Sequence, residues 1–196
     1  MPTKLDQVAL DQLFLKARSH NAWLPIGVPD NALHELYRIV RQGPTSHNGN
    51  PARLVFVRSE KGKQKLLPAL TNRNADSMLE APVTVIVAYD PHFHERLPEL
   101  FPAYDARALY RDNPRMSEEV ALRNSSLQGA YLMLAARALG LDCGPMSGFD
   151  NAQVDKAFFC ETGWKSNFLC SLGYGNPAAL RPLGSRLDLM EACRFE

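Results

Sequence analysis

Three short polar stretches hold most of the side chains that could bind a ligand. They read ARSHNAW (residues 17–23), GPTSHNGNP (43–51) and GPMSGF (144–149). Short hydroxyl and amide side chains, with backbone amides freed by glycine, suit the edge of a planar heterocycle and its phosphate. Each stretch taken alone is also what an ordinary turn contains. The three together predict a site for a phosphorylated heterocycle.

Other catalytic and metal-binding patterns are weak or missing in the sequence. GxGxxG, GxxxxGK[ST] and GxSxG are absent, which argues against a dinucleotide fold, a Walker phosphate loop and a serine hydrolase. His92, His94 and Glu95 form the only histidine cluster, and we expect an exposed loop there rather than a metal site. The four cysteines contain no CxxC pair, so neither zinc nor a disulfide framework is predicted.

Composition narrows the class of protein. The 196 residues are 45% hydrophobic and 22% charged, as expected of a globular chain, and we expect one domain over 1–196. A formal net charge of +1 gives no electrostatic case for nucleic acid or an anionic membrane. Neither a signal peptide nor a membrane helix is evident, and with the cysteine pattern this predicts a cytoplasmic protein.

Hydrophobic periodicity predicts helices that cover a small sheet, in an α+β or α/β sandwich. The expected helices are 5–18, one capped by Asp30 with the stripe Leu33, Leu36, Tyr37 and Val40, 60–70, 117–139, and 150–158. The expected strands are 54–57, 83–88 and 167–175. Pro68 must end or bend its helix, and residues 140–150 are expected to form a loop because they hold three glycines and a proline.

Three segments have an unusual character for a small domain. Residues 90–116 hold four prolines without a clear period, which predicts short helical turns that act as a lid or face a partner. The helix 117–139 is apolar nearly all round in its second half, so we expect it to be buried in a core or a subunit interface. The tail 176–196 has little apolar content of its own and is expected to be frayed or to lie across another surface.

Nearly the whole chain resembles the FMN-dependent nitroreductase family. The phrases that carry the resemblance are GPTSHNGNPARLVFVR, APVTVIVAYD, RNSSLQGAYLMLAARALGLDCGPMSGFD and KSNFLCSLGYG. They are most similar to one branch, the malonic semialdehyde reductases (3-hydroxypropionate dehydrogenases) of bacterial pyrimidine utilisation. The resemblance implies an α+β nitroreductase fold with a central mixed or antiparallel sheet flanked by helices. It also implies an interlocked homodimer, with FMN between subunits and the tail 176–196 reaching over the partner.

The resemblance also implies a set of FMN-binding residues. The basic-x-Ser phosphate and ribityl motif is matched by Arg18, Ser19 and Asn21, and the loop that reaches FMN from the neighbouring subunit by Pro44, Thr45, Ser46 and Asn48. Asn74 matches the asparagine at the pyrimidine edge of the flavin, and Arg186 a phosphate-binding arginine. The segment behind the ring is matched by Pro145, Met146, Ser147 and Gly148, with the backbone N–H of Ser147 directed at flavin N5.

The sequence departs from the family pattern at four of these positions. Asn21 and Ser77 stand where many members have basic residues near flavin N1 and O2, so another group, such as Arg18 or a helix N-terminus, must stabilise the reduced flavin. Ser147 stands where glutamate is common, which matters little if the contact is made by the backbone. Gly184 stands where a second basic residue usually precedes Arg186.

The implied reaction is ping-pong hydride transfer from NADH or NADPH through FMN to an aldehyde, and no catalytic acid or base on the protein is needed for the flavin step. The carboxylate of malonic semialdehyde calls for a cation, and Arg123 is the first choice because it lies on a helix expected to be buried. Arg107, Arg111 and Arg115 are the other candidates. The alternatives are a broad nitroreductase or quinone reductase and, more remotely, a flavin-free binding or scaffolding dimer.

Overall fold

A computed structural model describes residues 3–196, and these residues contain one four-stranded sheet. The strands are β1 (Ala52–Val57), β2 (Val83–Tyr89), β3 (Asp142–Met146) and β4 (Lys165–Gly173). Their order in the sheet is β1-β2-β4-β3, and every neighbouring pair is antiparallel. The expected α+β fold is therefore confirmed, with an antiparallel sheet.

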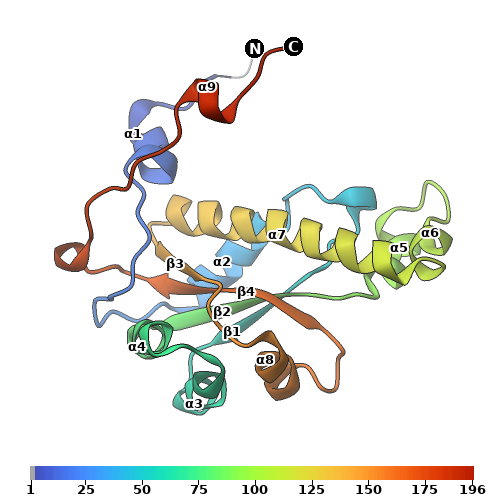
Figure 1. Cartoon of the computed structure of the whole chain (residues 1–196), viewed down its shortest axis with the longest axis horizontal. Helices are drawn as coiled ribbons and strands as arrows, with labels where there is room; N and C mark the ends of the chain where they lie inside the picture. The colour runs from blue at the N-terminus through green and yellow to red at the C-terminus, as the bar shows by residue number, and fades with distance from the viewer. Residues whose placement is uncertain (1–2) are drawn as a thin grey trace.

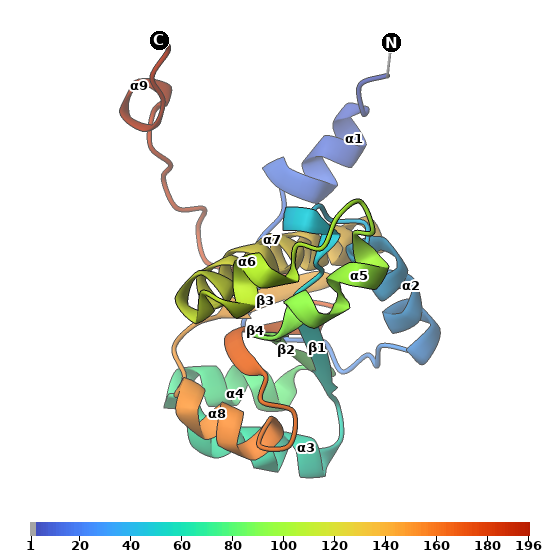
Figure 2. The ribbon, with the colours of Figure 1, turned by 90° about the vertical axis from the view of Figure 1, so that its right-hand side faces the viewer.

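Helices cover both faces of the sheet (Figure 1). They are α1 (Gln7–Leu10), α2 (Asp30–Val40), α3 (Glu60–Leu66), α4 (Asn72–Glu80), α5 (Leu97–Leu100), α6 (Arg107–Arg111), α7 (Pro114–Ala138), α8 (Asn151–Phe158) and α9 (Leu189–Ala192). In both views α7 and α2 lie on one face, while α3, α4 and α8 lie on the other (Figures 1 and 2). The sheet is thus the middle layer of three.

The alternation of side chains along β2 explains these layers. Val83, Val85 and Val87 point into a core built with α2 and α7. Ile86 and Ala88 point to the opposite face, into the core that packs against α3, α4 and α8. Every residue of β2 is buried, as its continuous β-branched run predicts.

The strand β3 corrects the expectation of a loop over 140–150. Pro145 lies inside this strand and pairs with Cys170 of β4. Proline is tolerated there because β3 is an edge strand, where the missing N–H takes nothing from a neighbour. Glycine and proline usually mark loops, and this edge position is the physical reason that the expectation was wrong.

The remaining differences concern the ends of helices and strands, and two helices that the sequence did not indicate, α4 and the short α9. The helix α4 has only Ser77 and Met78 buried, so its apolar pattern is too short to detect. The helix α7 starts at Pro114 rather than Ser117, because the Asn113 side chain accepts the Met116 N–H (3.1 Å) and proline suits the first turn. Asp30 lies in the first turn of α2 rather than capping it.

The expected helix 5–18 is shorter in the structure and changes type. After α1 the chain continues as a π-helical turn over Asp11–Leu15 and then becomes extended. The expected helix 60–70 ends at Leu66, and a 3-10 turn over Leu67–Ala69 takes in Pro68, as the proline predicts. The cap of α8 by Asp150, which accepts the Gln153 N–H (3.1 Å), is confirmed.

Two apolar surfaces that were expected to be buried are open within this chain. On α7, Leu122, Leu127 and Tyr131 are 42%, 48% and 38% exposed, so the helix is not enclosed on all sides. Tyr37 of α2 is also exposed, because it faces away from the core that holds Leu36. These apolar side chains are available to a second molecule.

The other two unusual segments, 90–116 and the tail, differ in how they pack. Residues 90–116 form short helical turns whose aromatic side chains build a small core of their own with the first half of α7. The tail beyond Leu180 is exposed along its length and extends away from the sheet, past α7 (Figures 1 and 2).

Several absences apply to residues 3–196 only. In that part of the chain no helix is both long enough and apolar enough to cross a membrane. Nor do three or more His, Cys, Asp or Glu side chains gather there as a metal ion would require. His94 corrects the expectation of an exposed loop: it is buried, its ring hydrogen-bonds to the Ser117 hydroxyl (3.3 Å), and burial lowers its pKa.

Candidate functional site

The polar stretch 18–21 lies along the outer edge of β3. Ser19 forms a parallel bridge with Cys143, and the His20 N–H donates to the Cys143 carbonyl (2.9 Å). Gly144 makes this close approach possible, since a Cβ at that position would stand 2.3 Å from the His20 carbonyl oxygen. Two of the three polar stretches are therefore brought together.

The buried side chain of His20 holds this stretch against the body of the protein. Its side chain is buried and fills the space beside Gly175, where a Cβ would come within 1.9 Å of the ring. Its Nε2 lies 3.4 Å from Asp142 Oδ1, and Asp142 Oδ2 accepts the Gly175 N–H (2.9 Å). Because His20 points inward, its neighbours Ser19 and Asn21 are left exposed on the outer side.

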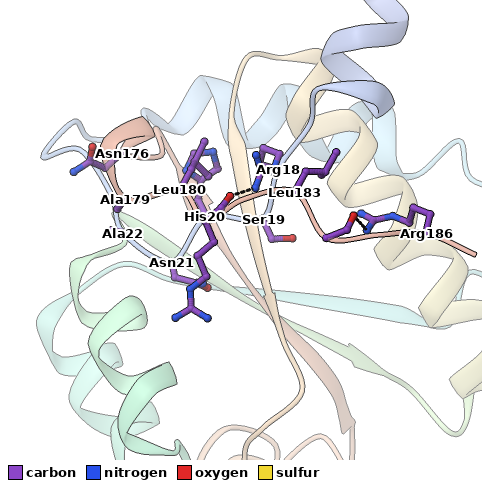
Figure 3. A pocket seen from close by; sticks show the side chains of 12 residues that line it. Arg18, Ser19, His20, Asn21, Ala22, Asn176, Ala179, Leu180, Leu183 and Arg186 are labelled. Atoms are coloured by element: carbon purple, nitrogen blue, oxygen red, sulfur yellow. Dashed lines mark hydrogen bonds between the residues drawn. The ribbon is translucent and has the colours of Figure 1, made fainter.

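Arg18, Ser19 and Asn21 line a cavity of about 190 Å³ together with the first part of the tail (Figure 3). The tail supplies Arg181 and Arg186, so three arginines contribute to the lining of the cavity. No aspartate or glutamate of residues 3–196 lines the cavity. Guanidinium groups that line a cavity without a carboxylate can pair with a bound anion such as phosphate.

The guanidinium groups are only partly used within the chain. Arg18 donates from Nη2 to the Arg181 carbonyl, and this contact joins the stretch 18–21 to the tail. Arg186 donates from Nη1 to the Gly184 and Ser185 carbonyls (3.0 Å each). Each arginine carries five N–H donors, so both retain donors for a bound anion.

Residues 145–148 continue the same edge. Because Pro145 has no N–H, its pairing with Cys170 is the non-hydrogen-bonded kind, and the ladder alternates from there. The backbone of Cys143 faces outward, as its bond to His20 shows, and the same alternation turns the Ser147 N–H outward. Pro145 is exposed and Met146 is buried, so one face of this edge is open to solvent and the other packs against the core.

Asn74 of α4 closes one end of this segment. Its Nδ2 donates to the Gly148 carbonyl (2.8 Å), and the Thr71 hydroxyl points at the same oxygen (3.4 Å). The half-buried Asn74 amide is thus held beside Ser147 and Gly148. Ser77, one turn further along α4, is buried instead, and its hydroxyl lies 3.4 Å from the Trp23 indole nitrogen.

The third polar stretch lies elsewhere. Pro44, Thr45, Ser46 and Asn48 precede β1, which is the opposite edge of the sheet from β3. Three strand spacings, about 14 Å, separate these edges. One chain therefore does not assemble all three stretches into one site.

The expectation that Arg123 lies on a buried part of its helix is wrong. Its side chain is 64% exposed in this chain and pairs with Glu119 one turn earlier on α7. An exposed pair of this kind contributes little to stability, about 0.3–0.5 kcal/mol. Arg107 and Arg111 are likewise paired, with Asp105 and Asp112, and the hydrogen bonds from Arg107 lower the pKa of Asp105 to about 2.

Sequence reasoning missed three residues of this region. Arg181 lines the cavity, His20 anchors the stretch 18–21, and Thr71 reaches the Gly148 carbonyl. A basic residue five positions before Arg186 was the only signal for Arg181. For His20 the signal was its place between two outward positions of an extended segment.

The comparisons with known proteins agree with this fold. The family model of the nitroreductase family matches residues 15–174. A candidate NADH dehydrogenase/NAD(P)H nitroreductase from Stutzerimonas stutzeri is 58% identical over 193 residues, 98% of each chain. A relative of the same description from Xanthomonas oryzae is 58% identical over 197 residues and covers both chains fully.

Two solved structures show the same fold at low identity. A candidate nitroreductase from Bacillus subtilis has a TM-score of 0.88 at 20% identity, over 97% of this chain and 100% of that one. A candidate nitroreductase from Exiguobacterium sibiricum in complex with FMN has a TM-score of 0.85 at 20% identity, over 100% and 99%. The fold, the family model and the close relatives lead to one conclusion: this chain belongs to the nitroreductase family.

Proposed function

We propose that the chain is an FMN-dependent NAD(P)H oxidoreductase. The observation that carries the proposal is the cavity beside β3, which is lined by three arginines and, within residues 3–196, by no carboxylate. This donor set fits the phosphate of FMN, and the outward Ser147 N–H on the same edge fits a ring atom of the flavin. When bound, FMN supplies hydride transfer through N5, in ping-pong order, between the nicotinamide and a substrate. The E. sibiricum complex with FMN and the names of the close relatives support the same cofactors.

In this proposal the chain's own residues bind and orient FMN. Arg18 and Arg186 hold the phosphate, with Arg181 as a further donor. Ser19 and Asn21 offer hydroxyl and amide groups to the ribityl chain, and Asn74 offers its amide to the pyrimidine edge. The Ser147 N–H would donate to N5, and Pro145, Met146 and Gly148 would form the wall behind the ring. Ser77 is buried and uncharged, so another group would have to stabilise the flavin's reduced form.

A second copy of the chain completes the site in this proposal. The loop of Pro44, Thr45, Ser46 and Asn48 lies at the β1 edge, so it reaches a flavin at the β3 edge only from a neighbouring subunit. The exposed apolar side chains of α7 give the second copy a surface to bury. A homodimer with two FMN molecules between its subunits follows.

The tail is the second contact that we assign to the dimer. A groove of about 1230 Å³ lies between α2 and β1, and Tyr37, Leu54 and Phe56 contribute to its lining. The tail presents Leu187, Met190 and Phe195 without covering them in its own chain. The groove also has polar and charged side chains in its lining, and it lies beside an open sheet edge. An extended segment with both apolar and charged side chains suits such a groove, so we place the partner's tail there.

A spectrum of the purified protein tests the proposal directly. We expect a yellow protein, or one that becomes yellow on titration with FMN, with the flavin bleached by NADH or NADPH and reoxidised by malonic semialdehyde. A colourless protein that takes up no FMN would instead favour a flavin-free binding or scaffolding dimer. Comparing the two nicotinamides in this assay also settles the electron donor.

The proposed substrate is malonic semialdehyde, which would be reduced to 3-hydroxypropionate. Support comes from the sequence resemblance and from the presence of Arg123 on α7. Within residues 3–196 its exposed guanidinium has only Glu119 as a partner. A substrate carboxylate could replace Glu119 in a two-pronged pair with this guanidinium.

Replacing Arg123 by alanine tests this substrate. Loss of a charge-assisted pair costs about 1.5–3 kcal/mol, so KM for malonic semialdehyde should rise about 10- to 100-fold while KM for a neutral quinone changes little. Steady-state kinetics on both substrates provide the measurement. Glu119→Gln is the matched control, because it frees Arg123 without removing it and should not raise KM. Equal effects of Arg123→Ala on both substrates would show that the arginine does not read the carboxylate.

A broad nitroreductase or quinone reductase is the second candidate function. The relatives that are 58% identical carry names of this kind, which is the observation in its favour. The ratio of kcat/KM for malonic semialdehyde to kcat/KM for a nitroarene separates the two. A ratio far above one supports the semialdehyde, and a ratio below one supports the broad reductase.

A further inference from the structure

The loop between α2 and β1 holds an uncommon backbone conformation. His47, Asn48 and Asn50 all have positive φ, at 52°, 49° and 43°. Residues other than glycine rarely adopt the left-handed region, and each such residue has an energetic cost unless its surroundings hold it there. Three of them within four positions require a specific set of contacts.

Most of those contacts come from the segment 90–116. His47 Nδ1 lies 2.7 Å from the Tyr110 hydroxyl, and its Nε2 lies 2.8 Å from the Tyr104 hydroxyl. The ring also meets Phe101 edge-on, with centroids 5.1 Å apart. Asn48 donates from Nδ2 to the Leu100 carbonyl (2.9 Å). Both ring nitrogens of His47 are therefore hydrogen-bonded to one neighbouring segment.

That segment is itself fixed to the body of the protein. Tyr110 is 2% exposed and packs against Phe93, with ring centroids 4.9 Å apart. Burial raises the pKa of Tyr110, so its hydroxyl stays protonated. The Ser117 hydroxyl of α7 donates to the Pro91 carbonyl (2.8 Å) and closes the start of the segment. Within this chain, 90–116 acts as a support for the loop rather than as a free lid.

We propose that His47 is a positioning residue, held between Tyr104 and Tyr110, which fixes the loop of Pro44 to Asn48 in the shape that receives FMN. This inference rests on the proposed function, because it takes that loop to be part of the flavin site. Asn48 and Ser46 support the same geometry. Asn48 donates from Nδ2 to the Leu100 carbonyl, and the Ser46 N–H donates to Asn124 Oδ1 (2.9 Å). Both residues are also exposed, so each combines a contact within the chain with an outward-facing surface.

Replacing His47 by asparagine isolates the ring contacts from the backbone. Asparagine tolerates the left-handed region, so the substitution keeps the preferred φ but its side chain is too short to reach both tyrosines. We expect the Kd for FMN to rise about tenfold from the loss of two hydrogen bonds. We also expect trypsin to cut the apoprotein faster at Arg107 and Arg111, because the segment loses its contact with the loop. Tm should change little.

A double-mutant cycle distinguishes the hydrogen bonds of His47 to Tyr104 and Tyr110 from general destabilisation. Tyr104→Phe combined with Tyr110→Phe removes only the two hydroxyls, and His47→Asn added to this pair should weaken FMN binding no further. His92→Asn is the matched control, because His92 is an exposed histidine of the same segment, and it should behave as wild type.

Each outcome decides between the inference and the proposed function. If wild type binds FMN and His47→Asn binds it equally well, or if the histidine and tyrosine effects simply add, the positioning role is wrong while the proposed function stands. If wild type binds no FMN, the proposed function is wrong. The role of His47 in FMN binding is then wrong too, and tryptic cleavage of the His47→Asn apoprotein shows only whether His47 holds the segment 90–116: faster cleavage means that it does, and unchanged cleavage that it does not.

Discussion

Replacing Arg18 and Arg186 together by alanine is expected to weaken FMN binding by about 100- to 10,000-fold. Each arginine can give charge-assisted hydrogen bonds to the phosphate, and each loss costs about 1.5–3 kcal/mol, or roughly 10- to 100-fold in Kd. Both residues line the cavity, and their removal leaves Arg181 as its only arginine among the described residues. Fluorescence titration of the apoprotein with FMN measures the effect.

The two arginines should not contribute in the same way. Arg18 also joins the stretch 18–21 to the Arg181 carbonyl, so Arg18→Ala is expected to loosen the tail, whereas Arg186→Ala removes only a cavity-lining group. Arg18→Lys keeps the charge but loses the planar fork, and we expect an intermediate Kd. Arg38→Ala is the control, because Arg38 lies on α2 in a surface pair with Glu35. Unchanged FMN binding in the double variant would mean that the phosphate binds elsewhere.

The parts of the fold that could be predicted from sequence are those with a local cause. The β-branched run of β2 predicts a strand that is buried on both faces, and helices do pack against both faces of β2. Asp150 begins α8 because its side chain accepts a backbone N–H of the first turn. Such signals are contained within a few residues, so they are readable without knowing what lies nearby.

The parts that could not be predicted depend on position in the whole molecule. Gly144 and Pro145 of β3 indicate a loop until the strand is known to lie at the edge of the sheet. The exposed side chain of Arg123 was expected to be buried, because an apolar helix predicts its own burial without saying which neighbour covers it. The helix α7 still has an open face, and only a second molecule would change that.

Some parts of the candidate site could likewise be predicted from sequence, and others could not. The sequence identified three polar stretches, and the structure brings two of them together at the β3 edge through the bridge of Ser19 to Cys143. Arg181 was missed because its contact with Arg18 joins residues 163 positions apart. The third stretch lies at β1, and its place in a flavin site depends on a subunit contact that the proposed dimer supplies.

Gly144→Ala is expected both to destabilise the protein and to weaken FMN binding. The added Cβ would stand 2.3 Å from the His20 carbonyl oxygen, which is backbone and cannot rotate away, and 3.1 Å from the Trp23 ring. Relief requires the stretch 18–21 to move off β3. Overpacking of this kind costs about 1–3 kcal/mol, and displacement of Arg18 should raise the Kd for FMN more than tenfold. Urea unfolding and FMN titration measure the two effects.

Gly27→Ala is the matched control, since a Cβ at Gly27 meets no atom within 4 Å. If Gly144→Ala matches this control in both stability and FMN affinity, the stretch 18–21 does not depend on its close contact with β3. If Gly144→Ala is unstable but binds FMN normally, the contact matters for folding and the cavity forms without it. A joint loss ties the two together: a missing side chain on an edge strand allows a buried histidine to place Arg18, Ser19 and Asn21 where the tail arginines meet them.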